Sequence, residues 1–244
     1  GDVRASLAPK ARAILPEYLP DLNVLVCPSD PQAGNANPLM IASNAPSQQC
    51  PYLGQPSKPD VSYLYFGYLV DKGTEGGPTI DTVAFGLPSS NVSTQMAYIF
   101  GSLSYFPPAF NGPLGDFDPS NDAELDSDID NSPVYSLLSR FSSPSGAPFG
   151  NASGTTIYRL REGIERFLIT DINNPASTAA GQSTVPIMWD VVTTTTSETA
   201  QFNHIPGGAN TLYMDGHVTF NKYPDEFPAS ESFAALGALF DLGG

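Results

Sequence analysis

Two histidines and an aspartate near the end of the chain are the residues whose types best suit acid–base or metal chemistry. Ten residues separate His204 from Asp215, and His217 follows two positions later. A hydrolytic metal site needs two or three converging ligands and one open coordination position. Asp215-Gly216 instead lies between two β-prone runs, where the Asp side chain is needed for local backbone hydrogen bonds. The pattern favours a structural role for His204, Asp215, Gly216 and His217, with a secreted hydrolase as an alternative.

Other catalytic signatures are absent from the sequence. It contains no Gly-x-Ser-x-Gly elbow, no phosphate-binding loop and no HExxH motif. With only two histidines in the chain, general bases would have to be mainly carboxylates. We therefore expect a protein that is not an enzyme.

An acidic segment at residues 116–130 could hold calcium. It contains no basic residue, and Asp126-Ser-Asp128-Ile-Asp130 has the alternating carboxylates that suit a flexible calcium loop. It is not an EF-hand, because the sixth and twelfth positions are Asn131 and Leu137. The candidate calcium ligands are Asp116, Asp118, Asp122, Asp126, Asp128 and Asp130. The alternative is a solvated acidic loop that includes Glu124 as well.

The two cysteines, Cys27 and Cys50, enclose a loop rich in Pro, Asn and Ser. Because such a loop has little core of its own, a disulfide between them and an oxidising compartment are the preferred interpretation. Two buried thiols are the alternative. Neither cysteine has a second Cys or a His at metal-ligand spacing, so the sequence argues against zinc. Asn91-Val-Ser93 and Asn151-Ala-Ser153 fit the N-glycosylation pattern, which makes Asn91 and Asn151 weak candidate acceptors.

The composition restricts the class of partner. Lys and Arg number 10 against 25 Asp and Glu, which gives a formal net charge of -15. A chain this acidic is repelled by nucleic acid and by anionic membrane surfaces. No stretch approaches the roughly 18 to 20 apolar residues of a membrane-spanning helix. Hydrophobic residues are 41% of the chain, which excludes a disordered protein, and the many small polar residues favour a loop-rich, β-rich fold.

The elements that must position these residues follow from apolar periodicity. Helical spacing or composition predicts helices over the following ranges: 3–19, 94–105, 133–141, 156–169 and 232–242. β-branched and aromatic runs predict strands over 22–26, 61–70, 79–85 and 185–192. The run at 61–70 is apolar on both faces and is therefore expected to be a central strand. Irregular segments are expected at 28–60 and 107–155, the second as an acidic insertion in a single domain spanning 1–244.

The pair Asp215-Gly216 predicts a β-hairpin over residues 210–220. A two-residue type I′ turn would pair Met214 with His217, and Tyr213 with Val218. Pro206-Gly207-Gly208 supplies a second turn ahead of it. At the end of the chain, Phe233, Leu236, Leu239 and Phe240 form an apolar segment, which we expect either to dock on its own core or to cover a neighbouring subunit.

Three segments resemble one large bacterial family. The stretch from His204 to Val218 is similar to the C-terminal signature of prepilin-type proteins, a His, about nine residues, then Asp-Gly. Leu25 to Asp30 resembles the Cys-Pro-Ser-Asp segment after that family's first helix, and residues 166–171 and 188–190 are also similar. The family includes relatives of type II secretion pseudopilins, some of which hold calcium near a C-terminal loop.

The resemblance implies an α+β, pilin-like fold with an N-terminal helix packed on an antiparallel sheet and long irregular loops. Residues 3–19 would be the soluble half of that helix. The expected function is a structural subunit of an extracellular or cell-surface filament, whose partners are copies of itself. A calcium-stabilised carbohydrate-binding or adhesion module is the first alternative, suggested by Tyr52, Tyr63, Tyr65, Tyr68 and Trp189.

Overall fold

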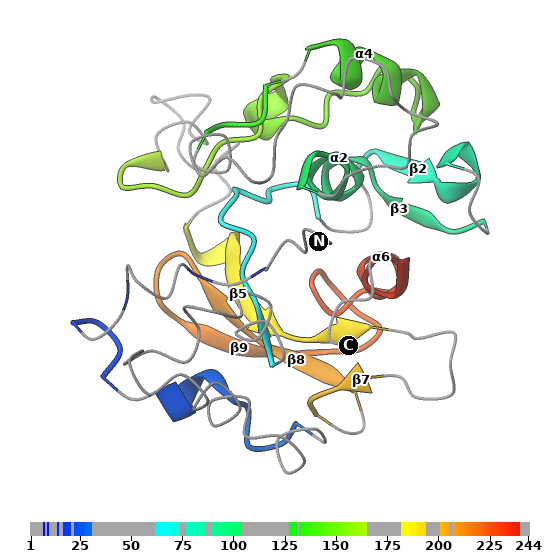
Figure 1. Ribbon diagram of the computed structural model, residues 1–244. Helices are drawn as coiled ribbons and strands as arrows, with labels where there is room; N and C mark the ends of the chain where they lie inside the picture. Colours follow the sequence, from blue (N-terminus) through cyan, green and yellow to red (C-terminus); the bar gives the residue numbers. More distant parts are fainter. Residues whose placement is uncertain are drawn as a thin grey trace, which may run out of the picture.

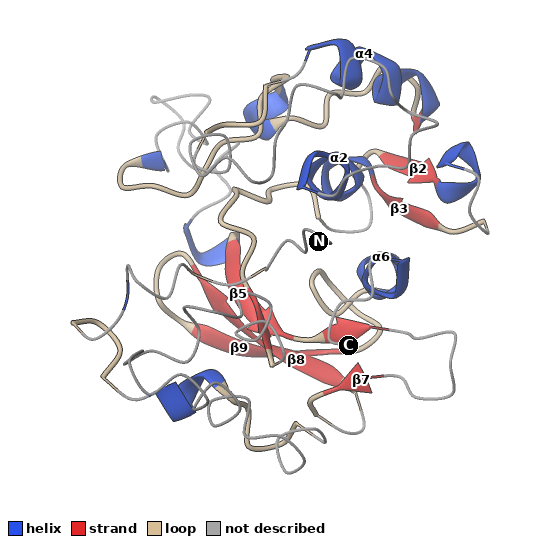
Figure 2. Cartoon of the chain, viewed as in Figure 1, coloured by secondary structure: helices blue, strands red, loops and turns tan. Residues whose placement is uncertain are grey.

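The chain has both α-helices and antiparallel sheets, which confirms the α+β class (Figures 1 and 2). The computed structural model describes residues 7, 9, 14, 17–20, 22–30, 62–73, 77–85, 89–103, 127–130, 132–164, 182–193, 201–204 and 207–239. The α-helices are α2 (Thr94–Leu103), α4 (Ser132–Phe141) and α6 (Glu231–Leu239), and the 3-10 helices are η1 (Leu22–Leu25), η4 (Thr82–Phe85), η6 (Asn151–Ser153) and η8 (Gln182–Thr184). The strands are β1 (Tyr63–Leu64), β2 (Thr79–Asp81), β3 (Asn91–Ser93), β4 (Ser142–Ser143), β5 (Pro186–Asp190), β6 (Val192–Thr193), β7 (Gln201–Phe202), β8 (Gly208–Tyr213) and β9 (Val218–Lys222).

The main sheet has four antiparallel strands in the order β1-β5-β8-β9. A three-stranded sheet, β3-β2-β4, lies with α2 and α4 in the other half of Figure 1, and β6 pairs with β7. In the described part of the chain, β1 and β9 are the edges of the main sheet. The expectation that residues 61–70 form a central strand is therefore wrong. Gly67 adopts φ +70°, a left-handed conformation that interrupts an extended strand, and only Tyr63–Leu64 joins the sheet.

One face of the main sheet is covered by α6, which lies between this sheet and α2 in Figure 1. Phe233 from α6 contacts Trp189 of β5 and Phe227 at ring-centroid distances of 5.6 and 5.2 Å. It also lies 6.1 Å from Phe66. Helix α6 begins where the Phe233 backbone N–H donates to the Ser230 hydroxyl, a capping interaction at the helix start. The apolar C-terminal segment thus docks on its own core through Phe233 and Leu236, whereas Phe240 lies outside the described residues.

Helices α2 and α4 extend the same core. Tyr98 of α2 makes edge contacts with Phe149 and with Tyr135 of α4, and the Tyr135 and Phe149 rings stack 3.9 Å apart. Because α4 contributes buried residues to the cluster that also contains Trp189, this part of the predicted 107–155 insertion is an integral element of the fold. Residues 107–126 lie outside the described chain.

Several predicted elements take a different form. Leu22–Leu25 is a 3-10 helix rather than a strand, and residues 156–164 form turns and isolated bridges instead of a helix. Their backbone groups pair across the chain: the Leu69 N–H donates to the Tyr158 carbonyl at 2.8 Å. This long-range pairing competes with a local helix. The predicted N-terminal helix at 3–19 lies largely outside the described residues, although Leu7 is buried in the core.

The β8–β9 hairpin exists, but its predicted register is wrong by one residue on β9. Leu212 pairs with Val218 and Thr211 with Thr219. The loop contains three residues, because the Tyr213 N–H donates to the His217 carbonyl at 3.0 Å. Gly216 adopts φ +90°, as expected for a three-residue loop that ends in a left-handed residue. Tyr213 therefore faces His217, and their rings stack 4.5 Å apart.

Candidate functional site

The face of the main sheet opposite α6 carries a cluster of Cys27, Asp190, His204 and Asn210. Side chains alternate along a strand, so Asp190 at the end of β5 points away from the core that Trp189 enters. Asn210 lies on the adjacent strand β8, and His204 follows β7. Cys27 follows η1, where the Asp30 N–H donates to the Cys27 carbonyl at 3.0 Å and closes a turn. Segments far apart in sequence thus meet at one point.

Contacts within this cluster converge on a single ring nitrogen. His204 Nε2 lies 3.0 Å from Asp190 Oδ2, 3.6 Å from Cys27 Sγ and 2.9 Å from Asn210 Nδ2. Asn210 also donates to Asp190 Oδ2 twice, from its backbone N–H at 2.7 Å and from its side-chain amide at 2.9 Å. Cys27, Asp190 and His204 each place one potential metal-ligating atom within 4.8 Å of the others.

Two of the three donor residues of the cluster are buried. Asp190 and Cys27 are buried, and His204 is partly exposed. Burial raises the pKa of the Asp190 carboxyl, against the lowering effects of Asn210 and His204. Burial also raises the pKa of the Cys27 thiol, opposed mainly by a hydrogen bond from the Ser29 backbone. The pKa of neighbouring Tyr63 rises to about 12, chiefly through burial and then through the charges of Cys27 and Asp190.

This arrangement differs from a Cys–His–Asp nucleophilic triad. In a triad, one ring nitrogen faces the nucleophile and the other donates to the carboxylate. Here the Cys27 and Asp190 contacts both fall on Nε2 of His204. One neutral imidazole nitrogen has either one N–H or one lone pair, so it satisfies only one of these neighbours. The chemistry that the cluster offers is a set of sulfur, nitrogen and oxygen donors around one point.

The sequence-predicted grouping of His204 with Asp215 and His217 separates into two places. His204 belongs to the cluster above, and Asp215 contacts His217 in the β8–β9 loop with Oδ1 to Nδ1 at 2.5 Å. Asp215 Oδ1 also accepts the His217 backbone N–H at 3.1 Å. Asp215, Gly216 and His217 thus lie together in the loop of the hairpin, and their structural role stays a prediction. The hydrolase alternative required His204, Asp215 and His217 to meet at one place, and His204 lies apart from the other two.

We expect the Asp215 carboxyl to titrate below its ordinary value of 3.8, because hydrogen bonds from His217 stabilise the carboxylate. A lowered pKa contributes stability above pH 3.8 that is lost as the pH falls through the lowered value. Carboxyl-carbon NMR titration measures this midpoint, and His217→Gln should move it back toward 3.8. A midpoint at or above 3.8 in the unaltered protein would contradict the interpretation.

The acidic segment is described only at its end. Asp128 accepts the Arg159 backbone N–H at 2.8 Å and forms an ion pair with Arg161 at 3.1 Å. The counter-charge that the local sequence lacks therefore comes from a distant segment, and the Asp128 carboxylate is already engaged. Asp130 is exposed, whereas Asp116, Asp118, Asp122 and Asp126 lie outside the described residues. Calcium binding by this segment stays a prediction.

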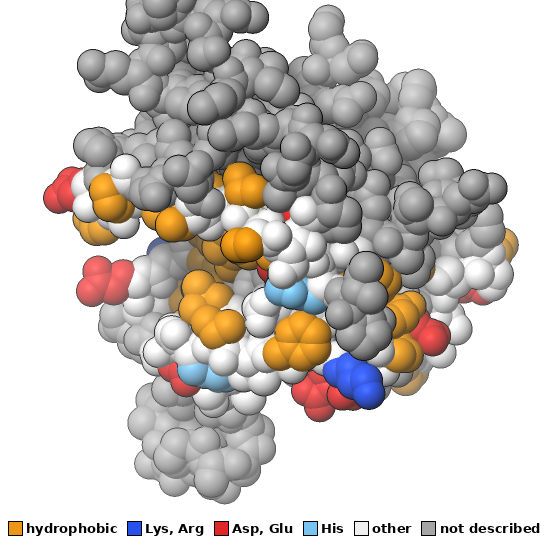
Figure 3. Space-filling model, turned by 90° about the horizontal axis from the view of Figure 1, so that it is seen from below, with side chains coloured by type: hydrophobic (Ala, Val, Ile, Leu, Met, Phe, Trp, Pro, Cys, Tyr) orange, Lys and Arg blue, Asp and Glu red, His pale blue; other side chains and the backbone are white. Residues whose placement is uncertain are grey.

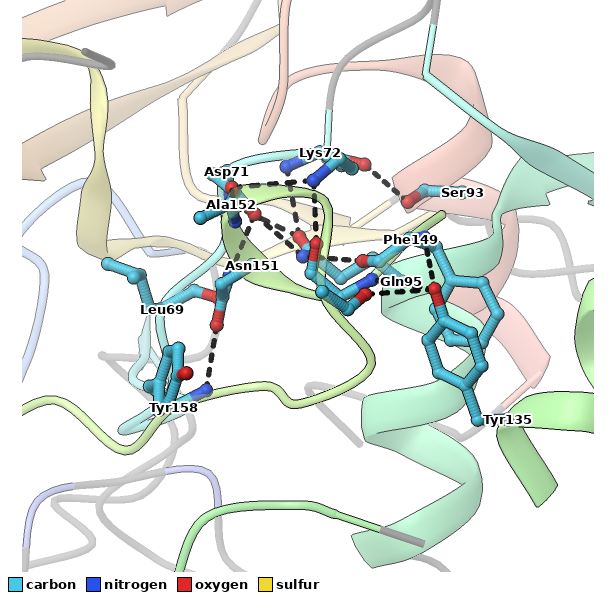
Figure 4. Close-up of polar contacts among 12 residues, drawn as sticks. Leu69, Asp71, Lys72, Ser93, Gln95, Tyr135, Phe149, Asn151, Ala152 and Tyr158 are labelled. Carbon is cyan, nitrogen blue, oxygen red and sulfur yellow. Dashed lines mark hydrogen bonds and ion pairs between the residues drawn. The ribbon is translucent and has the colours of Figure 1, made fainter. Parts of the chain in front are cut away.

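The two candidate glycosylation sites differ sharply. Asn91 is exposed at the start of β3, but Asn151 is 2% exposed and buried in a polar network (Figure 4). The Asn151 amide donates to the Leu69 carbonyl at 2.9 Å and to Asp71 Oδ1 at 2.7 Å, and its oxygen accepts the Tyr158 N–H at 2.7 Å. A side chain held this way is not available as a glycan acceptor in the folded protein. The prediction for Asn151 is therefore replaced by a structural role.

Cys27 has a free thiol in the described part of the chain, and the Cys27–Cys50 disulfide stays a prediction. Its sulfur is occupied by the contact with His204 on the sheet face. Cys50 lies outside the described residues. Of the aromatic residues behind the carbohydrate-binding alternative, Tyr68 and Trp189 are buried in the core, and Tyr63 and Tyr65 are half-buried. Tyr52 lies outside the described residues.

A second feature of the surface is the exposed strand β9. Val218 and Phe220 are 60% and 49% exposed, although both are large apolar side chains. They lie on the sheet face that carries Asn210 and His204, and the Phe220 ring is 5.9 Å from that of His204. Figure 3, which views the molecule from below, shows hydrophobic and histidine side chains side by side on this face.

Sequence reasoning missed Asp190 and Asn210. The available signal was a charge inside the apolar run Val185–Val192, since an ionised residue is almost never fully buried without a partner.

Among the described residues, no helix is both long and apolar enough to cross a membrane. The chain matches no protein-family model, and it has no match among curated proteins or solved structures.

Proposed function

We propose that this chain is a structural subunit of an extracellular or cell-surface, pilus-like filament, and that it acts by self-assembly rather than by catalysis. The observation that carries the proposal is the edge strand β9 with its exposed Val218 and Phe220. The edge of a sheet presents unpaired backbone N–H and C=O groups, which form a template for a strand from another chain. A second copy of this chain is the partner to which we commit.

Among the described residues, the hydrogen-bond alternation of β9 defines which backbone groups point away from β8. The Tyr213 N–H donates to the His217 carbonyl, and the Tyr223 N–H donates to the Gly207 carbonyl. Narrow and wide pairs alternate between antiparallel strands, so Thr219 and Asn221 point their N–H groups toward β8. Val218, Phe220 and Lys222 then direct theirs away from the sheet. Pairing along this row would extend the sheet and cover the apolar side chains together.

The resemblance to prepilin-type proteins supports the same function. It rests on the segment from Leu25 to Asp30, on the stretch from His204 to Val218, and on residues 166–171 and 188–190. It implies that a helix within residues 3–19 packs on the sheet. Repeated head-to-tail contact between identical subunits generates a helical filament when the rotation does not close. The acidic charge of -15 opposes assembly, so salt should promote it by screening.

Val218→Lys is the substitution that tests the contact. It places a charge on the edge strand, where lysine blocks edge-to-edge pairing, and Val218 has no core role to lose. Val83→Lys is a matched control, because Val83 on η4 is 57% exposed. We expect filaments in negative-stain images of the unaltered protein and of the control, but not of Val218→Lys. A monodisperse monomer at high concentration in salt, for the unaltered protein, would overturn the proposal.

A further inference from the structure

We propose that Cys27, Asp190 and His204 bind a zinc ion on the face of the sheet opposite α6. Their donor atoms come from three separate segments and lie within 4.8 Å of one another. Sulfur, imidazole nitrogen and carboxylate oxygen are the three donor types that zinc uses in proteins. The proposal is independent of filament formation, since it rests on contacts inside one subunit.

The distances within the cluster fit a tetrahedral ion. Zinc lies about 2.3 Å from sulfur and about 2.0–2.2 Å from nitrogen or oxygen, so tetrahedral angles separate the ligand atoms by about 3.3–3.6 Å. His204 Nε2 lies 3.6 Å from Cys27 Sγ and 3.0 Å from Asp190 Oδ2. These two separations are within a few tenths of an ångström of the tetrahedral values, and the Cys27 and Asp190 donor atoms lie within 4.8 Å of each other. Binding through Nε2 would displace the Asn210 side-chain amide, which lies 2.9 Å from that nitrogen.

A second, independent observation points to a ligand at this place. Asp190 Oδ1 is buried and has no hydrogen-bond partner in the described part of the chain. Its other oxygen, Oδ2, is held by two donors from Asn210. A buried carboxylate oxygen without a partner costs free energy, and a divalent cation would compensate it. Asn210 is a positioning residue, which fixes the orientation of the carboxylate in the manner of a second coordination shell.

The types of donor atom in the cluster select among metal ions. A sulfur and an imidazole ligand favour zinc over calcium and magnesium, which prefer oxygen donors. His204 is partly exposed, so the fourth position is open to a water molecule.

Such an ion would connect the turn after η1, the end of β5 and the segment after β7. The contact between Cys27 and His204 spans 177 positions of sequence. The ion would perform the cross-linking role that the sequence had assigned to a disulfide of Cys27. Because a metal bound mainly by the folded state stabilises that state, zinc should raise the melting temperature.

The experiment titrates the chelator-treated, full-length chain with cobalt(II), an optical probe for zinc sites, and then displaces the cobalt with zinc. We expect one equivalent to bind, with the visible bands of a tetrahedral ion and a thiolate-to-cobalt charge-transfer band. Zinc should also protect Cys27 from alkylation. Calcium provides the comparison with a hard cation and should produce neither effect.

The chain offers a matched control for every ligand. Asn210→Ala, which removes the residue that orients the Asp190 carboxylate, should weaken zinc binding by about 10–100-fold. Cys27→Ser, Asp190→Asn and His204→Gln each remove a ligand and should weaken it further. Cys50→Ser, Asp215→Asn and His217→Gln should leave the affinity within about twofold, since none of these residues is a proposed ligand or positioning residue.

Three results would overturn the proposal. The first is a cobalt spectrum of the unaltered protein without a thiolate band, which requires no variant to fold. The second is equal loss of affinity in the ligand variants and in their matched controls. The third is a Cys27–Cys50 disulfide in the native protein, detected by intact mass with and without reduction.

Discussion

Phe233→Ala should lower the free energy of unfolding by about 3–5 kcal/mol, the usual cost of removing a buried aromatic ring. Phe233 is 1% exposed, and it contacts Phe66, Trp189 and Phe227 at the junction between the main sheet and α6. The cavity would lie in the part of the core where the two halves of the fold meet, so relaxation can fill little of it. Urea denaturation followed by tryptophan fluorescence measures the effect, because Trp189 is the only tryptophan.

Phe141→Ala is the control for that substitution. Phe141 ends α4 and is 56% exposed, so its replacement should change stability by no more than about 0.5 kcal/mol. Similar losses for Phe233→Ala and Phe141→Ala would contradict the assignment of α6 to the core. A stable, monomeric Phe233→Ala protein that no longer forms filaments would instead indicate that the C-terminal segment takes part in the contact between subunits.

Asn151→Ala should cost about 3 kcal/mol or more, because it leaves several buried polar groups without a partner, each worth about 1–3 kcal/mol. The amide of Asn151 connects Leu69, Asp71 and Tyr158 (Figure 4). Gln95 completes the network by donating to Asp71 Oδ1 at 2.7 Å and to the Phe149 carbonyl at 2.9 Å. Thermal or urea denaturation provides the measurement.

Asn91→Ala is the matched control, since Asn91 carries the same three-residue glycosylation pattern but is exposed. Its replacement should leave stability nearly unchanged. A small effect of Asn151→Ala, comparable with that of Asn91→Ala, would show that the buried network does not stabilise the fold.

Elements specified by local periodicity were predicted well from the sequence. Helix α2 and strand β5 fall within their predicted ranges, and helices α4 and α6 each begin one residue before theirs. Elements that depend on distant partners were not. Residues 61–70 have a strand-forming composition, but Gly67 interrupts them and the backbone of Leu69 pairs with Tyr158. The hairpin was located correctly, but its loop contains three residues and ends at Gly216, whereas Asp-Gly had suggested a two-residue loop. The strand pairing is therefore shifted by one residue on β9.

The candidate site also depends on contacts between distant segments, and the sequence did not predict it. Local spacing argued against zinc, because neither cysteine has a nearby His or Cys. The cluster instead takes its three donors from the turn after η1, from β5 and from the segment after β7. Only the fold brings them together. Cys27, Asp190 and His204 all belong to segments that resemble the prepilin family, but the resemblance did not indicate that they meet.

Hydrogen–deuterium exchange along β9 tests the proposed assembly most directly. It compares amide exchange in assembled filaments with that in the dissociated subunit, resolved to single residues. Pairing of β9 with a second copy predicts that Val218, Phe220 and Lys222 gain protection on assembly. Thr219 and Asn221, whose N–H groups already face β8, should change little. Filaments in which the outward amides of β9 exchange as fast as in the free subunit would contradict assembly through this edge.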